Sequence, residues 1–400
     1  MDIVEKTDEH LVHEVIGPSL HPREAAAAIG MGVVSLLVAG VLPVLLGSLA
    51  DEHRLSAAGI GLAAMSEALC MGITAGLMGM LPRAENLRRI AVAAALAAAA
   101  IDLANTQAGM GLVIPLRGLA GIPEGVLLWI TVGMIARSET PERWAGVFFT
   151  TLVSAQLVLA LSFDWVILPR YGANGGLVVV ALCFVPALFL ATALPNRYAP
   201  LVRPPGEGGA PPPRGWVALL ATLIYVSSMA AVGIYLQPLA YEAGLTAEVA
   251  RTAIWTSLIA QILGGAAAAL LAGRLHYMGA FLFATLILFG TWATFAFHVP
   301  AWAFIAANAA GGFASIFLGP FLVPVTIEAD PTRRTAMQSA GAQLISGALG
   351  PALASQVVGE NHSHGALLLG FILSTVGLSI IAGLHLAARR EAIRISAASD

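Results

Sequence analysis

The sequence predicts an all-α membrane protein in which twelve transmembrane helices form two pseudo-symmetric six-helix bundles. Three observations carry this prediction: the composition, the length of the apolar runs, and one long polar break in the middle of the chain. The 400 residues are 58% hydrophobic and only 11% charged, with a mean hydropathy of +0.84. A soluble chain carries about 25% charged residues, so this composition excludes a soluble enzyme, a nucleic-acid binder and a disordered chain.

The apolar runs have the length of membrane-spanning helices. A helix needs about 20 mostly apolar residues to cross a hydrocarbon core of ~30 Å, and twelve runs meet this length. Their abundant Ala and Gly favour close packing between membrane helices. The expected spans are residues 27–49, 57–81, 90–107, 109–137, 144–167, 174–195, 215–240, 250–272, 277–298, 300–325, 335–358 and 364–388.

A Pro- and Gly-rich segment divides the spans six and six. The halves also resemble each other, because the offset in residue number between Pro141 and Pro331 is the same as that between Gly121 and Gly311. Transporters are often built from such repeats. The expected parts are a cytoplasmic tail at 1–23, an N-terminal six-helix bundle at 24–196, a cytoplasmic linker at 197–214, a C-terminal bundle at 215–390 and a second cytoplasmic tail at 391–400.

The basic residues predict the orientation. If the N-terminus is cytoplasmic, 16 of the 20 Lys and Arg residues lie on the cytoplasmic side, three lie outside and Arg117 lies within a span. Cytoplasmic loops carry such an excess of positive charge. The tail at 1–23 is polar and acidic, unlike the start of a secretory signal. We therefore expect a multi-pass protein of the bacterial inner membrane with both termini cytoplasmic.

Apart from residues at the span ends, four strongly ionisable residues lie inside the spans, all in the N-terminal half: Glu67, Asp102, Arg117 and Glu124. An intramembrane charge costs about 2.5–3.5 kcal/mol on insertion scales, so each needs a partner or a function. Seven residues turn a helix by about 700° and advance it by about 10.5 Å, so Arg117 and Glu124 share a face without pairing directly. Glu67 and Arg117 have similar depths, so the two side chains are able to pair.

Two interpretations of Arg117 stay open. It is either a permanent lock with Glu67 or a cavity residue that meets an anionic group. Glu124 follows Pro123, and desolvation disfavours its charged form, so we expect Glu124 to carry a coupling proton, with Glu67 as the second choice. The alternative for Glu124 is a neutral, hydrogen-bonded side chain. Asp102 lies near the outer end of its span and is expected to be solvated.

Neutral polar residues supply the candidate substrate site. Together with Arg117 we select Tyr235, Gln237, Gln156, Asn308 and Gln343, although membrane Gln, Asn and Tyr more often join helices to one another. The C-terminal half would recognise a solute by shape, aromatic rings and neutral polar groups. No cofactor or metal site is expected: the loop pair His362 and His364 is a weak metal signal.

Two motifs resemble the major facilitator superfamily of secondary transporters. Arg117-Gly-Leu-Ala-Gly121 is similar to the helix-4 motif of that family. The segment Gly79-Met-Leu-Pro-Arg83-Ala-Glu85-Asn-Leu-Arg88-Arg89 resembles its signature loop, without the aspartate and second glycine. The resemblance covers residues 24–390 and implies twelve helices, alternating access, and a gating role for the arginines of the loop. Residues 147–167 contain no Gly or Pro, which disfavours the drug/proton antiporters of the family.

The expected function is secondary active transport of a small organic solute, anionic or amphiphilic, coupled to the proton gradient. The expected partners are the solute, the lipid bilayer and protons; no nucleic acid is expected, and the protein should be a monomer. Alternatives are a multidrug or lipid exporter of the same fold, a non-coupled facilitator and, more distantly, a non-transporting receptor. No Gly-x-Ser-x-Gly, His-Glu-x-x-His or Walker-type sequence occurs, so neither an enzyme nor an ATP-driven pump is indicated.

Overall fold

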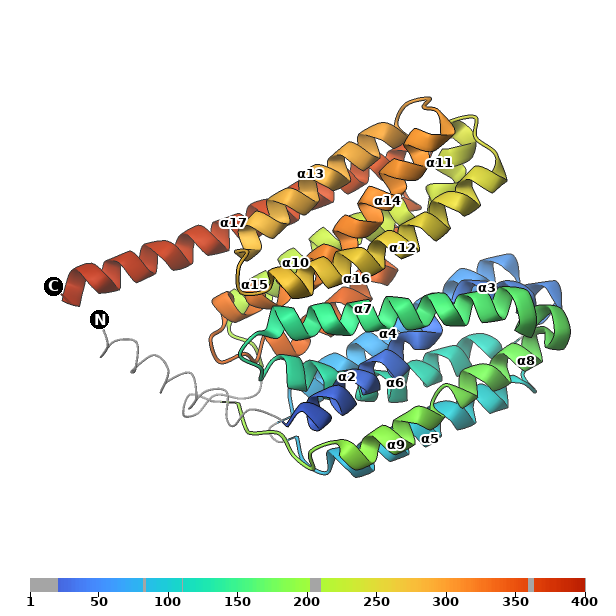
Figure 1. The fold of residues 1–400 in the computed structure, drawn as a ribbon, viewed down its shortest axis with the longest axis horizontal. Helices are drawn as coiled ribbons and strands as arrows, with labels where there is room; N and C mark the ends of the chain where they lie inside the picture. Colours follow the sequence, from blue (N-terminus) through green and yellow to red (C-terminus); the bar gives the residue numbers. More distant parts are fainter. Residues whose placement is uncertain (1–20, 82–83, 110, 202–209, 359–362, 400) are drawn as a thin grey trace. The chain divides into compact units, whose positions relative to one another are not determined.

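The computed structural model describes residues 21–81, 84–109, 111–201, 210–358 and 363–399. Within these residues the chain is helical without strands, apart from one isolated bridge between Glu85 and Arg197. The helices, labelled in Figure 1 where there is room, are α2 (Pro22–Leu37), α3 (Leu42–Asp51), α4 (Ala57–Gly79), α5 (Leu87–Asn105), α6 (Val113–Ile135), α7 (Pro141–Ser162), α8 (Leu168–Leu182), α9 (Val185–Ala193), α10 (Pro213–Gly233), α11 (Leu236–Glu242), α12 (Ala247–Leu271), α13 (Tyr277–Phe295), α14 (Ala301–Leu318), α15 (Leu322–Ala329), α16 (Ser339–Ala354) and α17 (His364–Ser399).

Every predicted span coincides with one helix or with consecutive helices in the described part of the chain. Spans one, six, seven and ten each contain two helices, namely α2 with α3, α8 with α9, α10 with α11, and α14 with α15. Nine helical stretches of the described residues are long and apolar enough to cross a membrane, and one of them, residues 141–193, covers two predicted spans. The predicted all-α membrane fold is therefore confirmed.

Proline explains where the spans break. Pro43, Pro186 and Pro320 each occupy the first turn of the helical segment that follows a break. A proline is tolerated there because its missing N–H would have no helical partner. Pro238 lies in the first turn of α11, directly after the break at Tyr235. Span five instead contains a π-helical turn at Phe163–Ile167.

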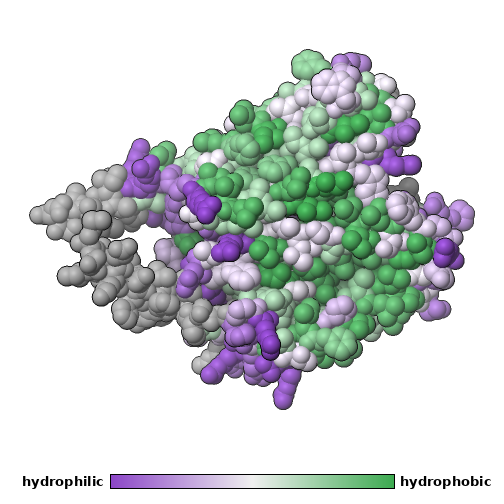
Figure 2. All heavy atoms as spheres, in the orientation of Figure 1, coloured by the Kyte–Doolittle hydropathy of each residue, from purple (hydrophilic) through white to green (hydrophobic). Residues whose placement is uncertain are grey.

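The outer surface is apolar along the helices. Figure 2 shows hydrophobic side chains over most of the visible face and hydrophilic ones toward helix ends. Large apolar side chains point outward, among them Leu270 (75% exposed), Leu286 (73%) and Phe189 (72%). A soluble protein rarely exposes so much contiguous apolar surface. These side chains are suited to contact lipid.

The described residues fall into two compact units. Unit 1 contains the chain up to Glu139, Thr151–Ala210 and Thr332–Gly341. Unit 2 contains Thr140–Thr150, Pro211–Pro331 and the chain from Ala342 onward. The four intramembrane charges belong to unit 1, and the aromatic core described below belongs to unit 2.

The helix bounds repeat with the same offset in residue number that the sequence suggested. The offset that relates Pro141 to Pro331 also relates the two ends of α5, Leu87 and Asn105, to Tyr277 and Phe295, which are the ends of α13. The first residue of α4 maps in the same way onto the first residue of α12. A constant offset over successive helices is the mark of an internal duplication.

Close backbone approach joins α4 and α6 in unit 1. A Cβ atom added at Gly121 would lie 2.3 Å from the carbonyl oxygen of Glu67, and one at Gly125 would lie 2.4 Å from that of Met71. Small residues allow membrane helices to pack at such short distances. This contact sets Arg117 and Glu124, on the same helix as the two glycines, against Glu67.

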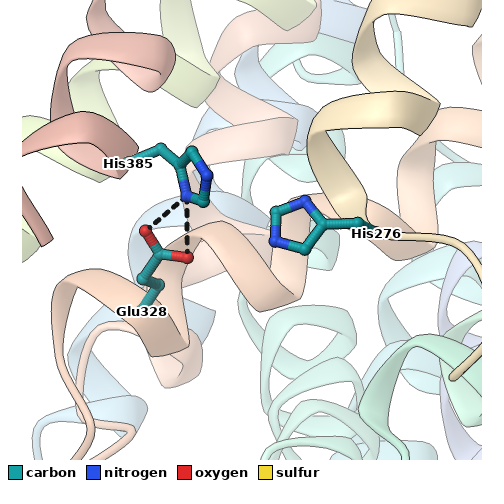
Figure 3. A group of neighbouring side chains, drawn as sticks. All are labelled: His276, Glu328 and His385. Atoms are coloured by element: carbon teal, nitrogen blue, oxygen red, sulfur yellow. Dashed lines mark hydrogen bonds and ion pairs between the residues drawn. The ribbon is translucent and has the colours of Figure 1, made fainter. Parts of the chain in front are cut away.

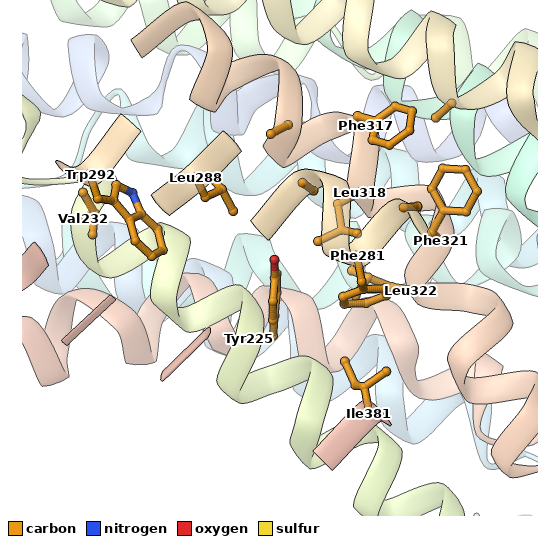
Figure 4. Packing of buried hydrophobic residues seen from close by; sticks show 14 of the residues in the cluster. Tyr225, Val232, Phe281, Leu288, Trp292, Phe317, Leu318, Phe321, Leu322 and Ile381 are labelled. Carbon is orange, nitrogen blue, oxygen red and sulfur yellow. The ribbon is translucent and has the colours of Figure 1, made fainter. Parts of the chain in front are cut away.

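Aromatic and branched side chains fill the core of unit 2. Figure 4 shows Tyr225 of α10 among side chains from neighbouring helices. The Tyr225 ring meets Phe281 edge-on at 5.2 Å between centroids, and its hydroxyl lies 2.6 Å from the Thr285 hydroxyl oxygen. No Asp, Glu, Lys or Arg lies in this cluster. The interior of this cluster is therefore held by packing and by hydrogen bonds such as that between Tyr225 and Thr285.

Candidate functional site

The four intramembrane charges form one buried cluster at the junction of α4, α5 and α6. Arg117 and Asp102 are fully buried, and Glu67 and Glu124 are 5% and 1% exposed. Glu67 comes from α4, Asp102 from α5, and Arg117 and Glu124 from α6. Three acidic side chains thus surround one guanidinium group.

Arg117 pairs with two of the three acids. Its Nη1 atom lies 3.4 Å from Oε2 of Glu67, as the matching depths of these residues predict. Its Nη2 atom donates a hydrogen bond to Oδ1 of Asp102. The expectation that Asp102 is solvated is wrong, because the face of α5 that carries it is turned toward α6 rather than toward water. No sequence motif marks this pairing, since the residues lie on different helices.

Glu124 contributes a third acid beside this pair. Its carboxyl group lies within hydrogen-bonding reach of the Glu67 carboxyl group. The Ser35 hydroxyl donates to the backbone carbonyl of Glu124 at 2.8 Å, which fixes the helix next to Pro123. Two carboxyl groups form a hydrogen bond only when one of them holds a proton. The geometry therefore suits a proton shared between Glu67 and Glu124.

The charges of the cluster do not balance when every group is ionised. Three carboxylates and one guanidinium carry a net charge of −2 when all four are ionised. Buried charges must be paired or neutralised. Several buried polar atoms, including Oε1 of Glu124 and Oδ2 of Asp102, have no hydrogen-bond partner among the described residues. Two bound protons would make the cluster neutral.

Unit 2 contains a cavity of about 260 Å³ between α10, α12, α13 and α14. Its polar lining comes from Ser257, Gln261, Thr291, Asn308 and Ser315, and its walls include Trp292 and Phe295. It therefore offers hydroxyl and amide groups beside aromatic rings, without a charged side chain. This is the character that the sequence predicts for the C-terminal half.

The cavity corresponds to the charged cluster under the internal repeat. Glu67 maps onto Ser257 and Asp102 maps onto Trp292, and both of these residues line the cavity. Arg117 and Glu124 map onto two alanines, at 307 and 314. The same place in the repeat therefore holds charged side chains in unit 1 and an open, neutral space in unit 2.

The other residues selected from the sequence lie at separate places. Asn308 lines the cavity and also donates to the carbonyl of Ala253 at 2.8 Å. Gln156 donates to the carbonyl of Leu36 at 2.8 Å, in unit 1. Gln237 is exposed and donates to the Tyr241 hydroxyl. Tyr235, Gln237 and Gln343 are not among the residues that line the cavity.

The residues of the predicted gating loop are described in part. Arg83 lies outside the described residues. Arg88 donates through Nε to the carbonyl of Leu194, the residue that follows α9, at 2.6 Å, and Arg89 is exposed. A basic side chain at the C-terminal end of a helix interacts favourably with its free carbonyl groups. This contact joins the start of α5 to the end of α9. The gating role of the loop arginines stays a prediction.

Of the two loop histidines, only His364 lies among the described residues. His362 lies outside them, and Nδ1 of His364 is 2.9 Å from Oε2 of Glu242. Glu242 also accepts a hydrogen bond from the backbone N–H of Ser363. His364 thus helps to hold the end of α11 against the start of α17.

Comparison with known proteins identifies the fold. No protein-family model and no curated protein matches the sequence. Among solved structures, a major facilitator superfamily transporter, FucP, in the outward conformation matches with a TM-score of 0.70 and 16% identity, over 90% of this chain and 98% of that chain. A variant of the E. coli fucose:proton symporter FucP matches with a TM-score of 0.67 and 15% identity, over the same shares. The chain is therefore a multi-pass membrane protein with the fold of the major facilitator superfamily of transporters.

Proposed function

We propose that the chain is a secondary transporter that couples the movement of a small organic solute to protons. The observation that carries the proposal is the cluster of Glu67, Asp102, Arg117 and Glu124, in which one cation faces three buried acids. Intramembrane carboxyl groups of this kind serve as proton relays in transporters. One structural neighbour is a fucose:proton symporter, which supports the same class of function.

Within the cluster, Glu124 is the proposed proton carrier and Glu67 its exchange partner. Asp102 is held by its hydrogen bond with Arg117, whereas Glu124 makes no ion pair within 4.0 Å among the described residues. A proton bound at Glu124 can pass to Glu67, which then releases Arg117. Proton loading thereby changes the charge pairing between α4 and α6.

The cavity of unit 2 is the proposed binding place for the solute. Its lining is neutral, with hydroxyl and amide groups on one part and Trp292 and Phe295 on another. Arg117 is engaged by two carboxylates, so it no longer argues for an anionic solute. The proposed substrate is a small neutral molecule that offers hydroxyl groups for hydrogen bonds and an apolar face for aromatic contact.

A ligand screen followed by a transport assay tests the proposal. A panel of neutral sugars, polyols and small amphiphiles is first tested for thermal stabilisation of the purified protein, since a ligand of the folded state raises its apparent stability. The ligand that stabilises is then used in proteoliposomes with an inward proton gradient. Accumulation that requires the gradient supports proton coupling, whereas equal uptake without it indicates a facilitator and overturns the coupling.

Glu124→Gln separates coupling from binding. Gln preserves the shape of the side chain and can hydrogen bond, but it does not titrate. We expect gradient-driven accumulation to fall to the equilibrium level, while ligand stabilisation and exchange between preloaded compartments persist. Glu248→Gln, at an exposed carboxylate of α12, is the matched control and should transport like the wild type. Wild-type accumulation in Glu124→Gln would remove this residue from the mechanism.

Filling the cavity tests the solute site. Ser315→Leu places a larger apolar side chain in the cavity, so we expect the ligand-induced stabilisation to disappear while the ligand-free protein remains folded. Ser379→Leu makes the same change on an exposed face of α17 and should bind the ligand normally. Unchanged ligand stabilisation in Ser315→Leu would place the solute elsewhere.

A further inference from the structure

Three side chains far apart in the sequence meet at one end of unit 2. His276 precedes α13, Glu328 lies in the last turn of α15, and His385 lies on α17. Figure 3 shows the His276 ring facing the pair formed by Glu328 and His385. One ligand atom from each residue, an imidazole nitrogen or a carboxylate oxygen, lies within 4.8 Å of the others. The arginine distribution predicts that this end of the helices is cytoplasmic.

The contacts hold two of these groups in fixed positions. Nδ1 of His385 lies 2.9 Å from Oε1 and 3.3 Å from Oε2 of Glu328. The Tyr277 hydroxyl donates to Oε2 of Glu328 at 2.8 Å and lies 2.9 Å from Nδ1 of His385. The rings of His276 and His385 have centroids 5.0 Å apart. The side chains of His385 and Glu328 are 17% and 28% exposed, so the site is partly shielded and still open to an ion from water.

We propose that His276, Glu328 and His385 form a site for a divalent transition metal ion of the zinc type. Two imidazoles and one carboxylate are the donor set that zinc and its neighbours bind, whereas calcium and magnesium prefer oxygen ligands alone. Three protein ligands leave a coordination position for water. The Tyr277 hydroxyl would hold the carboxylate from outside, as such partners commonly do at metal sites.

The position of the site suggests what a bound ion would do. The ligands come from the start of α13, from α15 and from α17, which are separate in the chain. An ion bound there would cross-link three helices at one end of unit 2. The proposed transport function uses none of these residues, so the metal site stands or falls independently of it.

The structure provides a substitution that removes a ligand and spares the fold. His276 is also the N-cap of α13, where its Nδ1 accepts a hydrogen bond from the N–H of Met278 at 3.2 Å. Asn is among the preferred N-cap residues, so His276→Asn keeps a cap while it removes the imidazole. His298→Asn makes the same change at an exposed histidine outside the cluster and is the matched control.

Zinc binding to the purified full-length protein tests the proposal. The protein is prepared with an affinity tag that contains no histidine, stripped with a chelator and titrated with Zn²⁺ alone against a chromogenic chelator. We expect the wild type and His298→Asn to bind one equivalent of Zn²⁺ tightly. The affinity for Zn²⁺ should fall at least tenfold in His276→Asn and about tenfold in Tyr277→Phe. Co²⁺ in place of Zn²⁺ should give visible absorption bands that His276→Asn lacks.

A second ligand variant ensures that the test does not depend on the folding of His276→Asn alone. Glu328→Gln keeps an acceptor for the Tyr277 hydroxyl but loses the carboxylate, and it too should bind Zn²⁺ at least tenfold more weakly. The metal-free melting curve of each variant shows that it is folded. No stoichiometric binding by the wild type, or equal affinity in His276→Asn and His298→Asn, would overturn the proposal.

Discussion

Arg117→Gln tests how the buried charges of unit 1 support one another. The substitution leaves Glu67 and Asp102 buried without their common counter-charge. At the observed 3.4 Å between Nη1 and the Glu67 oxygen, two unit charges attract by about 5 kcal/mol at an effective dielectric constant of about 20. Measured losses on breaking a buried pair are about 3–5 kcal/mol. We therefore expect a large fall in stability from this single change.

Removing the acids one after another from Arg117→Gln should restore its stability step by step. Arg117→Gln with Glu67→Gln still leaves Asp102 without its partner, so this double variant should recover only part of the loss. Adding Asp102→Asn leaves the three substituted side chains neutral and Glu124, which can hold a proton, as the one remaining acid. This triple variant should come within about 1–2 kcal/mol of the wild type, because a buried pair replaced as a whole is often nearly neutral. The triple variant should remain unable to accumulate solute.

Thermal unfolding of the detergent-purified proteins measures this series. The defect of Arg117→Gln should also shrink as the pH falls, because protonated carboxyl groups no longer need a counter-charge. Arg251→Gln, at an exposed arginine of α12, is the control and should melt like the wild type. A triple variant as unstable as the single one, or a harmless Arg117→Gln, would refute the pairing scheme. An active triple variant would make Arg117 purely architectural.

Two further predictions concern packing and orientation. Gly121→Ala brings a Cβ to 2.3 Å from the Glu67 carbonyl oxygen and should lower the free energy of unfolding by about 1–3 kcal/mol through overpacking. The control Gly118→Ala meets only side chains at 3.5 Å or more and should be neutral or stabilising. Equal melting temperatures for the two variants would contradict the close contact. In a background without native cysteines, a cysteine at Arg274 should react only with reagent added to the cytoplasmic side, and one at Gln107 only from outside. Labelling of both from one side would overturn the predicted orientation.

The sequence by itself determined the positions of the spans. Bilayer thickness sets the length of an apolar helix, and hydropathy is read from neighbouring residues alone, so all twelve spans could be placed without knowledge of the packing. Proline also acts locally, and the break at Tyr235 lies directly before the first turn of α11, which contains Pro238. The Glu67–Arg117 pair could be foreseen as well, because depth along a helix follows from counting residues at a constant rise.

Only the tertiary structure decided which helix faces meet. The sequence predicts Asp102 near water, yet it is fully buried against Arg117, because the rotation of α5 about its axis depends on its neighbours and not on its own hydropathy. The cavity beside Trp292 exists because α10, α12, α13 and α14 leave space between them, which no single segment encodes. His276, Glu328 and His385 meet for the same reason: contacts between residues on separate helices are set by the way the helices pack, and a local pattern does not contain that information.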